Sequence, residues 1–487
     1  MKTNRKCIAL LTVLPAFTCF NNSDAAGTEK PNFIIIFTDD QGYADLGVSG
    51  AKGYKTPNID KLAAGGIRFT DFYVASPVCS PSRAALLTGC YPQRVGIPGV
   101  LYPEKAGEKS ERNSRTQVGL NKSETTIAEM LKGQGYATAC VGKWHIGHHT
   151  ESLPLQHGFD EYLGLPYSND MRTENNPLYP KLPLLKGNKV ERYLETDLSS
   201  LTTEYTNYAV DFVKRQKDKP FFLYLAHSMP HVPLYVSDKF KGKSEQGMYG
   251  DVIMEIDWSV GQIRKTLDEL GISKNTMVIF TCDNGPWLIY GNHAGSAYPF
   301  REGKKTTFEG GQRVQCIMNW PGTIPTGKLC SEMATSMDIL PTIAHFSGAS
   351  LPALKIDGHN ISDLILKEGA NTPTEEFFYY RYKSLQAVRS GKWKLHVPHN
   401  YLTVVAKGVD GKVGTEDENA KIGLSLFDLS TDPGEKKNLA QQYPEVVAGL
   451  LQKVEKARAD LGDGNVPGTG CRECGWTLET ENPWLPK

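Results

Sequence analysis

The sequence lacks an excess of charge of either sign and has no long apolar run beyond its N-terminus. Its 487 residues carry 54 lysines and arginines against 54 aspartates and glutamates, which gives a formal net charge of zero. This balance gives no support to a nucleic-acid-binding or membrane-surface role. Because no later apolar run is long enough, no segment of the mature chain is expected to span a bilayer. Internal repeats are also lacking although glycine and proline are frequent, a composition typical of a loop-rich globular protein.

Residues 1–26 have the layout of a secretory signal peptide. Three basic residues lie within the first six positions, an apolar run follows at residues 7–20, and small residues end the segment. We therefore expect cleavage near Ala25 or Ala26 and export, to the periplasm or out of the cell. Lipoprotein anchoring at Cys19 is disfavoured, because the two residues before it fit such a processing site poorly.

The sequence also lacks the paired cysteine motifs of a zinc site. Cys471 and Cys474 form a single CxxC without a second pair of ligands nearby, so a local disulfide or two free thiols is favoured. An exported chain meets an oxidising compartment in which disulfides form. The spacing of the cysteines does not give their pairing, which stays open here.

Acidic side chains follow two apolar runs that lie far apart in the chain. An unbroken apolar run is typical of a strand buried on both faces. The runs at residues 33–37 and 277–282 are followed by Asp39, Asp40, Asp283 and Asn284. Adjacent carboxylates repel each other, and oxygen ligands from several carboxylates and an amide favour a hard cation, calcium in particular. The pattern therefore predicts a cation site where two strands end.

Two further apolar runs lead into lysine and histidine. The runs at residues 135–141 and 220–226 are followed by Lys143, His145, His227 and His231. In open α/β sheets, ligands gather at the carboxyl ends of the strands. Strands and helical patterns alternate over most of the chain. The sequence thus predicts an α/β fold with a large, mostly parallel or mixed central sheet sandwiched by helices, in a domain at residues 27–370.

The composition changes near residue 371. Strand-like runs follow at residues 377–380, 385–389, 393–397 and 426–429. With the helical pattern at residues 444–461, they predict a smaller C-terminal domain, residues 371–487, of antiparallel sheet packed by one helix. Residues 162–192 and 462–487 show little periodicity, and we expect no regular element there.

A short helix is predicted to begin just after Cys79. Ser80 is a good N-cap, Pro81 suits the first helical position, and Gly89 is a good end signal. Unpaired N–H groups and the positive end of the helix dipole would then meet beside Cys79. Arg83, four residues on, adds a fixed cation, so this spot is predicted to attract an anion.

The pattern Cys-x-Pro-x-Arg at residues 79–83, followed by Leu-Thr-Gly, resembles the signature of the type I sulfatases of the alkaline phosphatase superfamily. Three more segments resemble the arylsulfatase-like members of this family, in the same order along the chain. They are Gly-Lys-Trp-His at residues 142–145, His-Val-Pro at 231–233, and Gly-Lys-x-Thr-x-x-Glu-Gly-Gly at 303–311. The resemblance extends over residues 32–461 and implies a sulfuric ester hydrolase.

The resemblance implies that Cys79 is oxidised to formylglycine (3-oxoalanine) by a formylglycine-generating, sulfatase-maturing enzyme. The hydrated aldehyde has two hydroxyls on one carbon: one attacks sulfur and releases the alcohol, and the other expels sulfate as the aldehyde re-forms. The family's calcium ligands correspond here to Asp39, Asp40, Cys79, Asp283 and Asn284.

The same resemblance implies roles for the charged residues. Arg83, Lys143 and Lys304 would surround the transferring group and stabilise its charge. Asp283 would help to activate the hydrate. Lys305, the neighbour of Lys304, is expected to face solvent.

Two histidines are assigned to proton transfer by resemblance. His231, with Lys304, would serve the leaving group, and His145 would take the proton that triggers sulfate release. Because histidine titrates near neutral pH, the division of these two roles stays open. His227 competes with His231 for its place, and the His-x-Pro segment favours His231.

The expected substrate is a sulfate monoester of a small molecule or oligosaccharide, with sulfated glycans favoured by the export signal and aryl sulfates kept open. A phosphate mono- or diester hydrolase of the same superfamily is the first alternative, and an inactive secreted glycan-binding homologue is the second. The sequence does not give the regiochemistry or the oligomeric state. Loop residues that offer substrate contacts are His148, Asn169, Asp170, Arg172, Trp287, His293 and Arg301.

Overall fold

The computed structural model describes Met1 and residues 30–105, 118–478 and 483–484. Apart from Met1, the predicted signal peptide at residues 1–26 lies outside the described residues. Residues Pro31–Lys487 form one compact unit, distinct from Met1–Lys30. The division at residues 370 and 371 stays a prediction. No helix of the described residues combines the length and the apolarity needed to cross a membrane.

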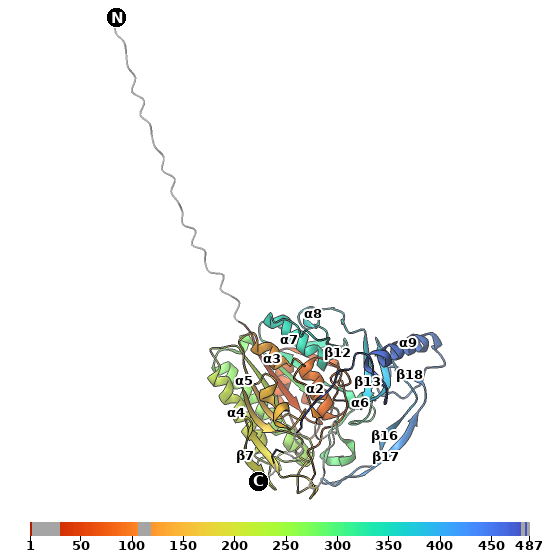
Figure 1. The fold of residues 1–487 in the computed structure, drawn as a ribbon, viewed down its shortest axis with the longest axis horizontal. Coiled ribbons are helices and arrows are strands. Elements are labelled where there is room, and N and C mark those ends of the chain that lie inside the picture. The colour runs from red at the N-terminus through yellow and green to blue at the C-terminus, as the bar shows by residue number, and fades with distance from the viewer. Residues whose placement is uncertain (2–29, 106–117, 479–482, 485–487) are drawn as a thin grey trace. The chain divides into compact units, whose positions relative to one another are not determined.

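The unit is built on a mixed central sheet (Figure 1). The strands run in the order β11, β2, β10, β9, β1, β8, β4, β5, β6, β7, with β12 also paired to β2. Their bounds are β1 (Asn32–Thr38), β2 (Ile67–Tyr73), β4 (Ala137–Lys143), β5 (Glu161–Leu165), β6 (Leu182–Lys186), β7 (Lys189–Leu194), β8 (Phe221–Ala226), β9 (Thr276–Cys282), β10 (Arg313–Asn319), β11 (Lys328–Cys330) and β12 (Ala334–Thr335). The central strands β9, β1, β8, β4 and β5 are parallel, whereas β10, β6 and β7 run antiparallel to their neighbours.

Helices cover the sheet on both sides, as the sequence predicts. One group packs α4 against α5 and α5 against α1, and the other packs α2 and α3 against α7. The α-helices are α1 (Pro57–Ala64), α2 (Cys79–Thr88), α3 (Ile127–Lys132), α4 (Leu201–Arg215), α5 (Met248–Glu269), α6 (Glu309–Gln312), α7 (Ile339–Ser347), α8 (Ser362–Leu366) and α9 (Pro444–Leu461). Short 3-10 helices are η1 (Gly47–Ser49), η2 (Thr150–Ser152), η3 (Pro154–Gln156), η4 (Ser273–Asn275), η5 (Leu288–His293) and η6 (Ser336–Asp338).

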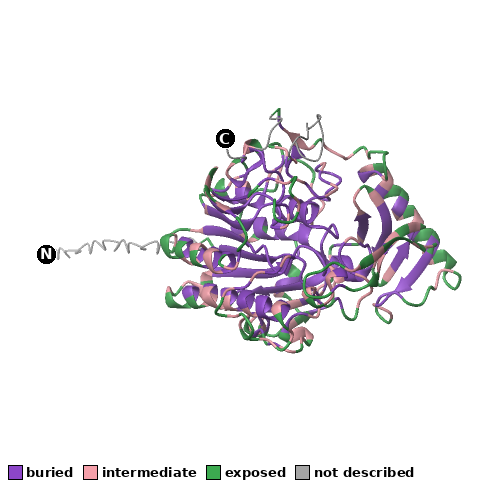
Figure 2. Cartoon of the chain, turned by 90° about the horizontal axis from the view of Figure 1, so that it is seen from below, coloured by how far each residue is buried: buried purple, intermediate pink, exposed green. Residues whose placement is uncertain are grey.

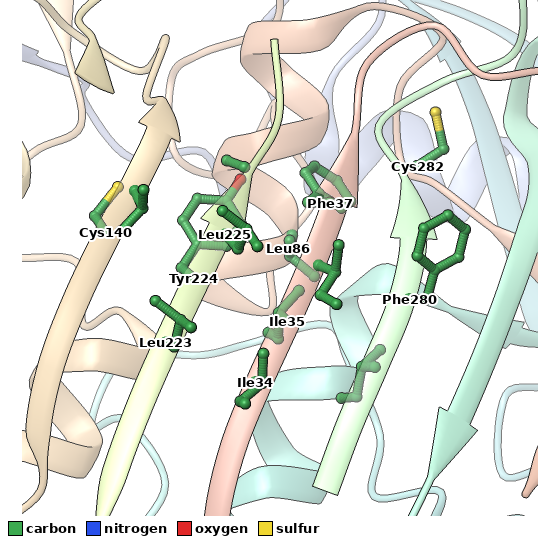
Figure 3. Close-up of a cluster of buried hydrophobic side chains, with 14 of the residues drawn as sticks. Ile34, Ile35, Phe37, Leu86, Cys140, Leu223, Tyr224, Leu225, Phe280 and Cys282 are labelled. Carbon is green, nitrogen blue, oxygen red and sulfur yellow. The ribbon is translucent and has the colours of Figure 1, made fainter. Parts of the chain in front are cut away.

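The core lies along the central strands. Every residue of β1, β8 and β9 is buried, because helices cover both faces of these strands (Figure 2). Figure 3 shows Ile35 and Phe37 of β1 beside Leu86 of α2, with Leu225 and Phe280 from the neighbouring strands. This packing fixes α2, and with it Cys79, against the carboxyl end of the sheet.

The C-terminal region holds a four-stranded antiparallel sheet, β13 (Glu376–Arg381), β14 (Ser384–Ser390), β15 (Trp393–His396) and β18 (Ser425–Asp428), on which α9 packs. This agrees with the predicted strands and helix. Strands β6, β7 and β19 (Gly475–Trp476) begin in segments where we expected no regular element, and β19 pairs with β3 (Val118–Gly119). The hairpin of β16 (His399–Ala406) and β17 (Thr415–Ile422) lies between predicted strands and was not predicted. The sequence interpretation of residues 162–192 and of the tail was therefore incomplete.

Candidate active site

Strands β1 and β9 bring four polar side chains to one edge of the sheet. The strands are parallel neighbours, and the N–H of Asp283 donates to the carbonyl of Thr38 at 3.1 Å. The N–H of Asp40 donates to Asp283 Oδ1 at 3.1 Å, and Asn284 Nδ2 donates to Asp40 Oδ1 at 2.7 Å. With Asp39, these side chains are at most 3% exposed. The predicted convergence of the two strand ends is thus present.

Helix α2 begins at Cys79 itself, not after it. Its N-cap is Val78, whose side chain forms no capping hydrogen bond, so the sequence assignment of Ser80 as N-cap was wrong. The Ser80 hydroxyl instead accepts the N–H of Leu101 at 3.1 Å, a tertiary contact that the local pattern does not contain. Gly89 ends the helix in a left-handed conformation, as predicted. Burial raises the pKa of the Cys79 thiol, which is only 3% exposed, so the unmodified side chain is a neutral thiol.

Arg83 points from α2 into the carboxylates rather than into open solvent. Its guanidinium donates to Asp283 Oδ2 at 2.8 Å, to Asp39 Oδ2 at 3.0 Å and to the carbonyl of Lys143 at 2.9 Å. The side chain is fully buried. Arg83 therefore joins β1, β9 and the end of β4 in one network.

Two lysines complete the set of buried cations. Lys143, the last residue of β4, donates from Nζ to Asp39 Oδ2 at 2.6 Å and to the Ser168 hydroxyl at 3.1 Å. Lys304 contacts both oxygens of Asp40, at 2.7 Å and 2.8 Å. Although burial opposes it, the Asp40 carboxylate raises the pKa of Lys304, so this lysine stays charged.

The carboxylates remain crowded despite these cations. Burial disfavours the ionised form of Asp39, but Lys143 and Arg83 outweigh it and lower the pKa of Asp39. Burial and the neighbouring Asp39 carboxylate raise the pKa of Asp283, although Arg83 opposes them. The three cations thus do not fully offset the repulsion among the carboxylates.

The two assigned histidines are both neutral. Each forms a hydrogen bond through a different ring nitrogen. His145 Nε2 lies 2.9 Å from the carbonyl of Leu101, and His231 Nδ1 lies 2.6 Å from the carbonyl of Val232. A carbonyl only accepts, so we assign the proton of His145 to Nε2 and that of His231 to Nδ1. Burial with Lys143 lowers the pKa of His145, and burial with Lys304 lowers that of His231.

This tautomer assignment leaves one lone pair on each ring. Nδ1 of His145 is buried and has no hydrogen-bond partner among the described residues. Nε2 of His231 lies 3.7 Å from Asp40 Oδ2. By contrast, His227 is buried against the Ser259 hydroxyl at 3.2 Å, and burial lowers its pKa to about 4. His231 rather than His227 therefore contacts the carboxylate cluster.

Several loop residues lie at the edge of this cluster. The Trp287 ring centroid is 5.6 Å from that of His231, and both Lys304 and Lys305 place Nζ within 4.6 Å of the Trp287 centroid. The Lys305 side chain is only 25% exposed, so the expectation that it faces solvent was wrong. Asn169 Nδ2 lies 3.5 Å from the carbonyl of His231.

Three other loop residues named as candidate substrate contacts, Arg172, Arg301 and His293, contact residues outside this cluster. Arg172 donates to the carbonyl of Glu195 at 2.8 Å and to the Tyr235 hydroxyl. Arg301 donates to the Tyr401 hydroxyl at 2.8 Å. His293, the last residue of η5, packs against the turn of the β16–β17 hairpin, where a Cβ built on Gly411 would lie 3.3 Å from its Nδ1.

Sequence reasoning missed two buried contacts. Ser168 follows β5, and its hydroxyl accepts from the Lys143 ammonium. Glu104 accepts from His148 Nε2 at 2.8 Å and His149 Nε2 at 2.6 Å, and these side chains form a buried group of metal-ligand types. No sequence signal identifies either contact, because Ser168 and Glu104 lie in irregular segments at a distance in the chain from their partners.

The residues present fit a hard cation at the β1–β9 edge. Among the described residues, Asp39 Oδ1 and Asn284 Oδ1 are buried and have no hydrogen-bond partner. Buried polar atoms in native proteins are normally paired, so these two oxygens need a ligand. Carboxylate and amide oxygens are the donors that calcium prefers.

Comparison with known proteins identifies the chain. The model of the family described as Sulfatase matches residues 31–349, and that of the C-terminal region of aryl-sulfatase matches residues 372–475. Arylsulfatase A of Bos taurus is 40% identical over 460 residues, covering 88% of this chain and 87% of that protein. N-acetylgalactosamine-6-sulfatase of Canis lupus familiaris is 38% identical, with 90% and 88% covered.

Several solved structures are also similar to this chain over most of its length. The PsFucS1 sulfatase from Pseudoalteromonas sp. superposes with a TM-score of 0.77 at 28% identity, covering 90% of this chain and 92% of that chain. Ps i-CgsB in complex with k-i-k-neocarrahexaose superposes at 0.73 and 28% identity, with 93% and 96% covered. The phosphonate monoester hydrolase of Agrobacterium radiobacter, at 0.58 and 19% identity, shares the fold alone.

A mixed α/β sheet whose strand ends converge on buried cations and carboxylates provides a site suited to an anionic substrate. The chain belongs to the sulfatase family, as its sequence predicts. It is accordingly a sulfuric ester hydrolase, and the alternative of a phosphate ester hydrolase is disfavoured.

Proposed function

We propose that this sulfatase cleaves sulfate monoesters of glycans, using one calcium ion and a formylglycine made from Cys79. The observation that carries the proposal is the convergence of Cys79 with three buried cations and three buried carboxylates at the carboxyl end of the sheet. Fixed, desolvated positive charge of this kind stabilises a transferring anionic group without having to reorganise.

The proposed calcium ligands are Asp39, Asp40, Asp283, Asn284 and residue 79. Two observations support this choice: the buried oxygens of Asp39 and Asn284 that have no partner among the described residues, and the raised pKa of Asp283. A bound dication would coordinate these oxygens and would stabilise the ionised form of Asp283. Bound calcium supplies positive charge that polarises the sulfate ester. Arg83 and Lys143 hold Asp39 by its other oxygen and so orient it.

Oxidation of Cys79 supplies the hydrated aldehyde as the proposed nucleophile. A neutral, buried thiol is a poor nucleophile, which supports modification rather than direct use of the cysteine. Since Cys79 is only 3% exposed, a sulfatase-maturing enzyme would have to reach it before folding is complete.

The proposed proton transfers use His145, His231, Lys304 and Asp283. Nδ1 of His145 carries a lone pair in its neutral form and accepts a proton there. At the leaving group, the Lys304 ammonium donates the proton that the departing oxygen needs, and Nε2 of His231, which carries no proton in this tautomer, lies beside Lys304 at the same oxygen of Asp40. Asp283, whose Oδ1 accepts the N–H of Asp40 and whose Oδ2 accepts from Arg83, helps to activate residue 79.

The glycan substrate is supported by the relatives and by the N-terminal sequence. Similar chains include N-acetylgalactosamine-6-sulfatase, and a similar structure binds k-i-k-neocarrahexaose. The signal-peptide pattern at residues 1–26 supports export to the periplasm or beyond, where such polymers are met, and anchoring at Cys19 is not part of the proposal.

The test is turnover by protein co-expressed with a sulfatase-maturing enzyme. Wild type is expected to cleave an aryl sulfate and sulfated sugars, and to lose this activity in the Cys79→Ala variant while keeping its melting temperature. Cys474→Ala, at a half-buried cysteine outside the cluster, is the matched control and should retain activity.

Two results would overturn the proposal. Retained turnover in Cys79→Ala would remove the formylglycine mechanism. Binding of sulfated sugars by the matured wild type without any hydrolysis would identify a binding protein instead.

A further inference from the structure

Four segments meet beside His231 to form what we call the Trp287 cluster: Asn169, Asp170, Trp287, Lys305 and Glu416. Trp287 is its centre, because its ring lies 5.6 Å from His231 and 4.9 Å from Tyr290. Asp170 follows Asn169 in the chain, and its charge adds to the effect of burial in raising the pKa of Tyr290, whose ring packs on Trp287. The cluster therefore borders the place where the leaving group of the ester would lie.

The cluster contains an unusual set of unsatisfied polar atoms. Asn169 Oδ1, Asp170 Oδ1, Trp287 Nε1 and Glu416 Oε1 are all buried and, within the described part of the chain, have no hydrogen-bond partner. Each such atom carries a desolvation cost that native proteins normally avoid. Three of the atoms accept hydrogen bonds and one donates, so they suit a ligand with several hydroxyl groups.

The charges of the cluster argue against a second anionic group on the substrate. Lys304 and Lys305 both place Nζ within 4.6 Å of the Trp287 ring centroid, but Lys304 is paired with Asp40, which leaves Lys305 alone against the carboxylates of Asp170 and Glu416. Lys305 reaches Glu416 only at 3.8 Å, and its backbone is held in the left-handed region at φ 70°. Strained positions of this kind are typical of functional sites. A uronate carboxylate would meet net negative charge here, whereas hydroxyl groups would meet acceptors.

Glu416 is supplied by the C-terminal region. It lies on β17 of the β16–β17 hairpin. Other residues of this hairpin form hydrogen bonds with loops of the catalytic region. The N–H of Gly408 donates to the carbonyl of Ile289 at 2.7 Å, and the Thr403 hydroxyl donates to Glu302 at 2.9 Å. The hairpin is thus fixed at the site, although its polar sequence gave no signal.

We propose that the Trp287 cluster binds the sugar ring that carries the sulfate, and that this ring is a neutral or N-acetylated pyranoside rather than a uronate. Its hydroxyls donate to Asp170, Glu416 and Asn169, and the Trp287 N–H donates to a ring or hydroxyl oxygen. This inference rests on the proposed glycan sulfatase function and assigns the substrate class to these residues.

The experiment compares substrates with and without hydroxyl groups. The matured enzyme is assayed on an aryl sulfate without hydroxyls, on monosulfated galactose, N-acetylgalactosamine and N-acetylglucosamine, and on a sulfated uronate. The variants are Asp170→Asn and Glu416→Gln, which keep the shape and remove a charged acceptor, and Trp287→Phe, which removes the N–H. Glu418→Gln, an exposed position on the same strand, is the matched control.

Wild type is expected to prefer a neutral sugar sulfate to the uronate. Each of the three variants should raise KM for that sugar about tenfold, the loss of one hydrogen bond to a charged or buried group, with kcat within about twofold. Losses on the aryl sulfate, which has no hydroxyl groups to bind, should be smaller than those on the sugar, and no kinetic value of Glu418→Gln should change.

Three results would overturn the inference. One is a preference for the uronate, the second is equal losses on the aryl and sugar sulfates, and the third is unchanged KM in all variants. In each of these the enzyme still cleaves the aryl sulfate, so the proposed function stands. A matured wild type that cleaves no sulfate ester at all removes the proposed function and the inference together.

Discussion

Lys143 donates from Nζ to Oδ2 of Asp39 at 2.6 Å, whereas Oδ1 of the same carboxylate is buried without a partner in the described chain. Arg83 shares that engaged oxygen at 3.0 Å. One side of Asp39 is therefore held by the protein's own cations, and the other side is left for a ligand. This division of one carboxylate between structure and ligand is the basis of the proposed calcium site.

Removal of divalent cations should lower both stability and activity. Binding at one hundred times the dissociation constant stabilises a folded protein by about 3 kcal/mol. We expect EGTA to lower the melting temperature by several degrees and abolish aryl sulfate turnover, and added calcium to restore both.

Asn284→Ala removes one of the two unpartnered oxygens and should weaken this calcium response at least tenfold. Asn292→Ala, at an exposed asparagine, is its control. An unchanged melting temperature and unchanged turnover in EGTA would contradict the site.

The loop that carries Lys304 is held by a buried lysine of the C-terminal sheet. Lys394 donates from Nζ to the carbonyl of Thr307 at 2.8 Å, to Glu309 at 2.9 Å and to Glu435 at 2.8 Å, and all three charged side chains are fully buried. Removing one member of a buried ion pair leaves an uncompensated charge and costs about 3–5 kcal/mol.

Lys394→Met should therefore destabilise the protein by roughly that amount, measured by chemical denaturation, and lower kcat/KM on an aryl sulfate by displacing Lys304. Lys392→Met, at a half-exposed lysine two residues away, should change stability by less than about 0.5 kcal/mol. Equal stability of the two variants would show that the buried network does not hold the loop.

Acid stability should depend on His157. Burial lowers the pKa of His157 to about 4, whereas an unfolded histidine titrates near 6.5. Between these values the unfolded state binds more protons, so stability falls as the pH falls from about 6.5 to 4, by about 3 kcal/mol for this one group.

His157→Phe keeps the ring that stacks at 5.9 Å on Trp144 and removes the titration. Its melting temperature should fall less than that of wild type between pH 7 and pH 4.5. His345→Gln, at an exposed histidine, should follow wild type. Parallel curves for wild type and His157→Phe would mean that His157 is not held neutral.

The C-terminal tail should contribute to stability through Arg472. This guanidinium forms two bonds of 2.7 Å with Glu124, whose side chain is 2% exposed, and a third to the carbonyl of Lys355 at 3.0 Å. Arg472→Met would leave the Glu124 charge buried and is expected to cost about 2–3 kcal/mol. Arg192→Met, whose half-exposed side chain bonds Glu204, should cost under about 1 kcal/mol in the same unfolding measurement. A smaller loss for Arg472→Met than for Arg192→Met would be inconsistent with this account.

The sequence predicts the parts of the fold that depend on burial. Strands β1, β8 and β9 are continuous apolar runs because helices cover both faces, and α9 has the bounds that its pattern indicates. It does not predict the β16–β17 hairpin or β7, whose residues are nearly all exposed or half-buried and carry no apolar alternation. Burial leaves a pattern in the residues, and an exposed strand at an edge does not.

The candidate site likewise has parts that the sequence predicts and parts that it does not. The meeting of Asp39 and Asp283 follows from two parallel strands ending at one edge. The contacts of Ser80 and Lys305 were misjudged, because tertiary partners decide them: the N–H of Leu101 for Ser80 and the Trp287 ring for Lys305. Roles that depend on loop packing can be proposed only once the loops are placed.

The measurement that tests the central claim most directly is the mass of the proteolytic peptide containing residue 79, taken from active enzyme. Our account predicts a peptide in which the thiol has been replaced by an aldehyde oxygen, in proportion to the specific activity on an aryl sulfate. An intact Cys79 thiol in protein that hydrolyses the sulfate at full rate would contradict it.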